Sequence, residues 1–151
     1  GTNYIYGTWS ALCGLNAAGV RADDPTVRRA AEWLASRQNP DGGWGEGGVS
    51  YWPDRIAEDR CPSTASQTAW ALLGLMAAGE VRGATVARGI RYLLDTRNAE
   101  GLWDEEDFTA VGFPRVFYLR YHGYAAIFPL WALARYRGLI EERRTTVPWG
   151  V

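Results

Sequence analysis

The chain has 151 residues, of which 47% are hydrophobic and 13% aromatic, and its formal net charge at pH 7 is −1. This length fits a single domain with a sizeable core. The near-neutral charge, without any basic run, argues against a nucleic-acid-binding protein. Eight Trp and eight Tyr predict either large interfaces between helices or a cavity walled by aromatic rings.

Few residues indicate the cellular compartment of the protein or whether the chain is part of a longer one. Cys13 lies in an apolar helical pattern and Cys61 in a loop, so a reducing compartment is expected rather than a disulfide framework. The longest nearly apolar run, 123–134, is too short to span a bilayer, which leaves attachment to a membrane face open. The chain has no initiator Met, and its one Met is Met76. We therefore expect it to be a segment of a longer protein.

Apolar residues at helical spacing predict five helices. Their ends are marked by capping residues such as Asp24 followed by Pro25, and by closing glycines such as Gly19 and Gly79. No strand pattern competes with them, and 145–151 is expected to be a tail without regular structure. In chain order, the helices are expected over 5–18, from Asp24 to Asn39, from Pro62 to Gly79, around 86–93 and over roughly 121–137.

A sequence motif recurs along the chain. Residues 38–44 read QNPDGGW and residues 97–103 read RNAEGLW, and an amphipathic run precedes each copy. Overlaying the two halves aligns Leu12 with Leu72 and Trp44 with Trp103, so the unit repeats after 60 or 59 residues. A helical repeat of this length predicts stacked helical hairpins. The predicted fold class is all-α, with two and a half helix pairs.

The motif has a physical reason to be structural. Its glycines allow positive φ and close backbone approach, and its glutamine amide can bind orphan groups at helix ends. The tryptophan can stack over that amide, and in the second copy Arg97 can stack on indole instead. We therefore assign a structural rather than catalytic role to Gln38, Gly42, Trp44, Gly101 and Trp103.

Together with these two copies, the stretch GFPRVFYLRYHGY at 112–124 resembles the squalene–hopene cyclases. These are class II triterpene cyclases whose signature repeat is this Gln…Gly-x-Trp motif, and the segments NYIYGT at 3–8 and STASQTAW at 63–70 extend the likeness. Residues 1–137 resemble the C-terminal quarter of such an enzyme. The resemblance implies that 1–140 form the C-terminal part of an (α/α) barrel catalytic domain, a partial toroid of repeated hairpins, and that 141–151 form a polar tail.

The resemblance also implies a reaction and its setting. The family protonates a terminal alkene of squalene, closes rings through carbocations, and ends by proton loss to hopene or water capture to hopanol. Neither a metal nor an organic cofactor is implied. The implied partners are squalene, the remainder of the cyclase chain, a membrane face and a second copy in a homodimer. The implied location is the cytoplasmic side of a membrane, with peripheral or monotopic attachment through the full-length enzyme.

A carbocation needs stabilisation by groups that do not trap it, and aromatic faces provide this at about 0.5–2 kcal/mol each. Judged without the resemblance, the aromatic residues of 112–124 are helix-packing residues. By resemblance, Phe113 and Phe117 match the family's cation-stabilising phenylalanines. Tyr121 and Tyr124 match tyrosines that shape or brace the cavity, and Tyr6 matches one near the hydrogen-bond network of the acid.

The protonating acid is missing from this chain. The family supplies it from an Asp-x-Asp-Asp motif, and alkene protonation needs such a carboxyl group held in its protonated form. Asp23 and Asp24 lack the leading aspartate and are better interpreted as helix capping. The acidic run 104–107 is expected to be solvated. We therefore predict that these 151 residues alone do not cyclise squalene.

Three alternatives stay open at this stage. A glycoside-acting (α/α) toroid would need two opposed carboxylates, for which Asp54 with Glu58, or Asp104 with Glu106, are the candidates. A protein prenyltransferase subunit would need a zinc site, which one His and two Cys without ligand spacing do not support; His122 is expected to be a packed or hydrogen-bonded helix residue. A non-catalytic helical-repeat module, or a degenerate cyclase remnant, is the third.

Overall fold

The computed structural model describes residues 3–47, 61–109, 111–113 and 116–150. Within these residues the chain is mainly helical, as the sequence predicts, and each expected helix is found. The five α-helices are α1 (Tyr4–Ala17), α2 (Pro25–Ser36), α3 (Ala65–Ala77), α4 (Ala84–Asp95) and α5 (Tyr124–Glu141).

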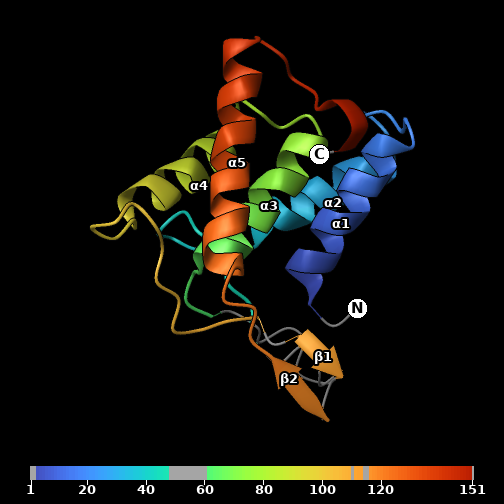
Figure 1. The fold of residues 1–151 in the computed structure, drawn as a ribbon. Coiled ribbons are helices and arrows are strands. Elements are labelled where there is room, and N and C mark those ends of the chain that lie inside the picture. The colour runs from blue at the N-terminus through green and yellow to red at the C-terminus, as the bar shows by residue number, and fades with distance from the viewer. Residues whose placement is uncertain (1–2, 48–60, 110, 114–115, 151) are drawn as a thin grey trace.

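The helices are arranged as stacked pairs. α3 lies between α1 and α5 and packs against both, so the first helices of successive pairs are neighbours (Figure 1). The second helices lie behind them: α2 packs on α1 and α3, and α4 packs on α3. This arrangement confirms the repeated hairpins predicted from the sequence.

The core is centred on α3. All 13 residues of this helix are buried, and its polar residues Ser66, Gln67 and Thr68 are hydrogen-bonded. α2 and α4 are amphipathic, and each buries one stripe of residues against the first-helix layer. α1 buries only Ile5, Trp9, Leu12 and Cys13, because its far side has no neighbouring helix in the described part of the chain.

The helix ends follow the predicted signals. The Asp24 carboxylate accepts a hydrogen bond from the Thr26 backbone N–H at 2.7 Å, which caps α2, and the Thr64 hydroxyl caps α3. Gly19 and Gly79 follow α1 and α3 with φ of 80° and 86°, a conformation that favours glycine. The interpretation of Asp24 as a capping residue is thus confirmed.

A two-stranded hairpin departs from the expectation of no strands. β1 (Val111–Phe113) pairs antiparallel with β2 (Phe117–Leu119), with Val111 opposite Leu119 and Phe113 opposite Phe117. Strands of three residues are too short to show alternation in the sequence. The hairpin lies beyond the end of the bundle at which α1 and α5 begin (Figure 1).

The end of the chain folds back instead of forming an irregular tail. After α5 it turns at Arg143, whose φ is 54°, and a 3-10 helix forms at Pro148–Gly150. Val147 is buried, and the Gly150 N–H donates to Asn16 Oδ1 at 2.7 Å. The expectation that 145–151 lacks regular structure is therefore wrong for residues 148–150, which pack on α1.

Candidate functional site

The glutamine of the first motif copy joins its own turn to the next helix pair. Gln38 Nε2 donates to the carbonyl oxygens of Gly42 at 2.8 Å and of Thr85 at 2.9 Å, and Arg88 donates to Gln38 Oε1. Thr85 and Arg88 belong to α4. The amide therefore bridges the turn after α2 and the first turns of α4, the structural role predicted for it.

The tryptophan of the same copy lies in the core. Trp44 is fully buried, its indole N–H donates to the Leu34 carbonyl at 2.8 Å, and its backbone N–H donates to Thr68 Oγ1 at 2.9 Å. Gly42 has a φ of 90°, a conformation that favours glycine. At Gly43 the backbone lies close to Ser63, so that an added Cβ would be 2.5 Å from Ser63 Cβ. The predicted stacking of the indole on the glutamine amide stays a prediction.

The second copy repeats the tryptophan geometry without the bridge. The Trp103 indole N–H donates to the Leu93 carbonyl at 2.8 Å, and Gly101 has φ of 80°. Arg97 Nε donates instead to the Leu94 carbonyl at 3.0 Å, at the end of its own helix. Among the described residues Arg97 makes no cation–π contact with Trp103, so the expected guanidinium clamp is not formed.

Two glutamates complete the repeat unit, and sequence analysis missed both. Glu46 follows Trp44 by two residues and accepts the backbone N–H groups of Tyr4 at 3.0 Å and Ile5 at 2.8 Å. A carboxylate at this place satisfies orphan donors and complements the helix dipole. The signal that could have found it was the repeat itself, because a glutamate also stands two residues after the second tryptophan.

That second glutamate, Glu105, caps α3 in the same way. Its carboxylate accepts the Ser66 backbone N–H at 2.5 Å and the Ser66 hydroxyl at 3.1 Å. Burial raises the pKa of Glu105, and the hydrogen bonds from Ser66 partly offset that rise. The expectation that the whole run 104–107 is solvated is therefore wrong at this position.

Aromatic rings converge where α1, α3 and α5 meet. Trp70 is fully buried, and its ring lies 5.0 Å from that of Tyr6, 5.6 Å from Tyr124 and 5.3 Å from Phe128, measured between centroids. Its indole N–H has no hydrogen-bond partner among the described residues. We call this group the aromatic cluster; its members are Tyr6, Trp9, Trp70, Tyr121, Tyr124, Phe128 and Trp131.

The cluster contains three of the five predicted pocket residues. Tyr6 is 37% exposed, and Tyr121 is 50% exposed and stacks on Tyr124 at 5.0 Å. The other two predicted residues stand on the hairpin. Phe117 is 44% exposed, and Phe113 is its partner in the β-ladder, but the Phe113 side chain lies outside the described part of the structure.

A cavity of about 310 Å³ adjoins the exposed edge of the cluster. Arg120 lies at its wall with the guanidinium 5.0 Å from the Phe108 ring centroid, and it donates to the Glu105 backbone carbonyl. His122 precedes α5 and is exposed, so the expectation of a packed helix residue is wrong. The lining includes Ser66, Glu105, Arg120, Tyr121, His122 and Tyr124.

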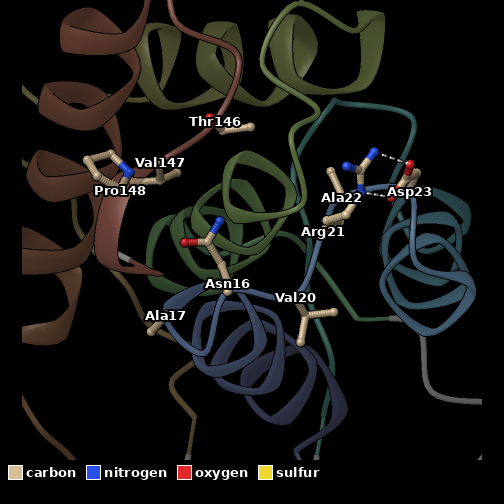
Figure 2. A pocket seen from close by; sticks show the side chains of 10 residues that line it. Asn16, Ala17, Val20, Arg21, Ala22, Asp23, Thr146, Val147 and Pro148 are labelled. Carbon is tan, nitrogen blue, oxygen red and sulfur yellow. Dashed lines mark hydrogen bonds and ion pairs between the residues drawn. The ribbon is translucent and has the colours of Figure 1, made fainter.

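A larger hollow of about 630 Å³ lies elsewhere, between the C-terminal end of α1 and the returning segment (Figure 2). Arg21 and Asp23 form an exposed ion pair there, with Nη2 and Oδ2 2.7 Å apart. Asn16 stands at its base and donates to the Ala77 carbonyl at 3.0 Å. None of the predicted pocket residues lines this hollow.

Of the residues nominated for the alternatives, Asp104 and Glu106 both line the cavity of about 310 Å³, in which no sugar-binding arrangement is described. Asp104 accepts a hydrogen bond from Asn98 at 3.1 Å, and Asp54 and Glu58 lie outside the described residues. Within the described ranges no group of His, Cys, Asp and Glu is placed to hold a metal ion. None of the helices there is both long and apolar enough to cross a bilayer.

Comparison with known proteins identifies relatives along the whole chain. Residues 1–138 match the family model of the squalene-hopene cyclase C-terminal domain. The chain is 69% identical over 151 residues to a squalene–hopene cyclase of Bradyrhizobium diazoefficiens, covering 100% of this chain and 23% of the relative. It is 43% identical over 161 residues to a dammaradiene synthase of Dryopteris crassirhizoma, with 98% and 24% covered. It is 37% identical over 147 residues to lanosterol synthase of Homo sapiens, with 95% and 20% covered. The chain thus spans less than a quarter of the length of these relatives.

Proposed function

Because this chain belongs to the squalene–hopene cyclase family, as a C-terminal domain of that family, we propose that it forms part of the wall of a cyclisation cavity. The longer enzyme that contains it converts squalene to hopene or hopanol through a series of carbocations. No metal or organic cofactor takes part in this proposal.

The aromatic cluster is the observation that carries the proposal. The centroids of its contacting rings lie 5.0–6.4 Å apart, and Tyr6 and Tyr121 form its exposed edge. Ring faces stabilise a cation by about 0.5–2 kcal/mol each without forming a bond to it. Apolar walls also exclude the water that would quench the reaction early. Such a surface suits a carbocation.

The five pocket residues keep the roles that the resemblance implies. Phe113 and Phe117 stabilise cations from the hairpin, where the ladder register sets them opposite each other. Tyr121 and Tyr124 brace the cavity, a role supported by their stacking at 5.0 Å. Tyr6 approaches the hydrogen-bond network of the acid, and its contact with Trp70 fixes its position.

The rest of the enzyme supplies what this chain lacks. The relatives are more than four times as long as the matched segment, and the protonating Asp-x-Asp-Asp motif belongs to that remainder in our proposal. The 151 residues alone are therefore inactive. The full-length enzyme attaches peripherally to the cytoplasmic side of a membrane, from which it draws squalene, and forms a homodimer.

A chimera tests this function directly. The matched C-terminal part of the Bradyrhizobium diazoefficiens cyclase is replaced by this chain, the protein is supplied with squalene in membranes, and the products are identified by mass spectrometry. Hopene is expected from the chimera and from its Val116→Ala variant, because Val116 is 78% exposed on the same hairpin. Products with fewer rings are expected from Phe117→Ala.

Each other outcome has a defined meaning. Hopene alone from Phe117→Ala would make Phe117 a packing residue. A folded chimera without any cyclised product would refute the proposed function. Hopene from the isolated 151 residues would refute the prediction that they are inactive.

A further inference from the structure

Trp70 departs from the sequence repeat that explains most of α3. The register that aligns Leu12 with Leu72 places Trp70 opposite Ser10 of α1. Ser10 is exposed, whereas Trp70 is 0% exposed. The repeat therefore accounts for a helix at this place but not for an indole ring, so the tryptophan has a reason that is particular to α3.

The ring of Trp70 contacts two of the predicted pocket tyrosines, which come from different helices. Tyr6 of α1 lies edge-to-face with it at an interplanar angle of 84°, and Tyr124 of α5 does so at 83°. Burial raises the pKa of Tyr124, and the nearby phenols of Tyr6 and Tyr121 raise it further. The three tyrosines therefore converge on one place, with Trp70 directly behind two of them.

Other rings hold Trp70 itself in place. Trp9 stacks on it at 6.2 Å with an interplanar angle of 12°, and Phe128 meets it edge-to-face at 5.3 Å. Its indole N–H has no hydrogen-bond partner among the described residues, so within them ring packing sets its orientation. A close-packed interior transmits a change at one side chain to the side chains that touch it. The positions of Tyr6 and Tyr124 thus depend on the bulk of Trp70.

We propose that Trp70 is a positioning residue of the cyclisation, whose indole fixes Tyr6 and Tyr124 in the orientations that the cavity requires. The proposal rests on the proposed function, in which these tyrosines belong to the cavity wall. Because Trp70 is fully buried within this chain, it acts through the tyrosines and does not itself touch the substrate.

A displaced tyrosine affects the reaction mainly after the substrate has bound. Squalene is an uncharged hydrocarbon, so a tyrosine ring contributes to its binding through apolar contact. Once a carbocation forms, the ring stabilises the charge electrostatically, and this attraction depends on distance and direction. A displacement of about 1 Å can lower a rate by about 100-fold. Loss of the indole should therefore lower kcat more than it raises KM.

The test introduces Trp70→Leu and the more conservative Trp70→Phe into the chimera described above. For Trp70→Leu we expect kcat to fall by about 10- to 100-fold with little change in KM, and products with fewer rings to appear. Trp70→Phe should retain more of the rate, because it keeps an aromatic ring beside the tyrosines. It also gives up no hydrogen bond made within the described residues.

Met76→Ala is the control for lost core packing. Met76 is also fully buried, and it lies near the other end of α3. Met76→Ala and Trp70→Leu both remove volume from the core and should lower Tm. Only Trp70→Leu should change kcat and the products.

A double-mutant cycle tests whether Trp70 acts through Tyr124. The values of kcat are compared for Trp70→Leu, Tyr124→Leu and the variant that carries both substitutions. If the indole works by holding Tyr124, the loss caused by Trp70→Leu is smaller when Tyr124 has already been replaced. Equal losses with and without Tyr124 would contradict this route.

Fluorine NMR follows the tyrosine without the reaction. Fluorotyrosine takes the place of Tyr124 in the chimera, and its spectrum is recorded without squalene. We expect one narrow signal with Trp70 in place, and a broadened or split signal in Trp70→Leu because the ring then adopts several orientations. Met76→Ala should keep the narrow signal.

Several results would overturn the proposal. They are unchanged kcat and products in Trp70→Leu, the same change of products in Met76→Ala, and a single narrow fluorotyrosine signal in Trp70→Leu. If Trp70→Leu does not fold, the same measurements are made on Trp70→Phe, and unchanged products with an unchanged signal would refute the positioning role. A chimera that makes no cyclised product, but whose signal broadens on Trp70→Leu, refutes only the cavity role.

Discussion

Gly89 offers a sharp test of how tightly the Gly-x-Trp turn packs on the following helix pair. It lies inside α4, where an added Cβ would be 2.8 Å from Trp44 Cζ3 and 2.8 Å from Leu72 Cδ2. Both of these side chains are fully buried, and an indole ring cannot bend away. Gly89→Ala therefore has no free space to enter.

Two opposing effects set the magnitude. Replacing glycine by alanine inside a helix stabilises it by about 1 kcal/mol. Overpacking a filled core costs about 1–3 kcal/mol, and two contacts this short place Gly89→Ala in the upper part of that range. The net loss is about 1–2 kcal/mol, which lowers Tm by about 2–8 °C for a protein of this size.

The assay is thermal unfolding followed by circular dichroism, with Gly138→Ala as the control. Gly138 also lies inside a helix, α5, but its added Cβ meets nothing within 4 Å. Only the helix-propensity gain then remains, so Tm is expected to rise by about 2–4 °C. A rise of equal size in both variants would refute the close packing of Trp44 against α4.

Three further predictions concern titration and capping. Burial raises the pKa of Tyr92 to about 12, whereas the phenol of the unfolded chain has a pKa near 10. Because the unfolded phenol ionises first, the stability of the wild type should fall between about pH 10 and 12. Urea unfolding should show a smaller fall in Tyr92→Phe. Burial also raises the pKa of Glu105. Part of the stability is therefore lost as pH rises from the pKa of Glu105 in the unfolded chain through its pKa in the folded protein. Glu105→Gln should reduce this fall in Tm, measured from pH 4 to 8. The variant should keep the cap, because its amide oxygen can still accept from Ser66. Asp24→Ala removes the 2.7 Å cap on α2 and should cost about 1 kcal/mol in chemical unfolding; an unchanged midpoint would contradict the capping role.

The repeat made most of the fold predictable. Capping at Asp24, closure at Gly19 and Gly79, and the buried tryptophan turns each have a local cause in a few neighbouring residues. The alignment of Leu12 with Leu72 showed that the same local signals recur in both halves of the chain, which predicted pairs of helices. The helical architecture therefore follows from the sequence without knowledge of long-range contacts.

The features that escaped prediction depend on distant parts of the chain. Glu105 sits in an acidic run, for which solvation is the usual interpretation, and only its contact with Ser66, 39 residues away, shows that it is a cap. The 3-10 helix at Pro148–Gly150 depends on the close approach of Gly150 to α1: an added Cβ there would lie 2.3 Å from the Cys13 carbonyl oxygen. No periodicity in the sequence reports such a contact.

The candidate site was predictable only in part for the same reason. Tyr6 and Tyr124 were singled out by resemblance, and the structure brings both onto Trp70. Trp70 stood only in the segment 63–70 that carries part of the resemblance, and no role was assigned to it. Its central position follows from the stacking of three helices, which no single segment encodes.

The glutamate caps also tie the start of each capped helix to residues that are made much later in synthesis. Glu46 closes the start of α1 from 41 and 42 residues further along the chain. The ribosome therefore releases the first helix of a pair before it has made the residue that secures the start of that helix. The start of α1 therefore gains this cap only after the whole of α2 and the first Gly-x-Trp turn have been made.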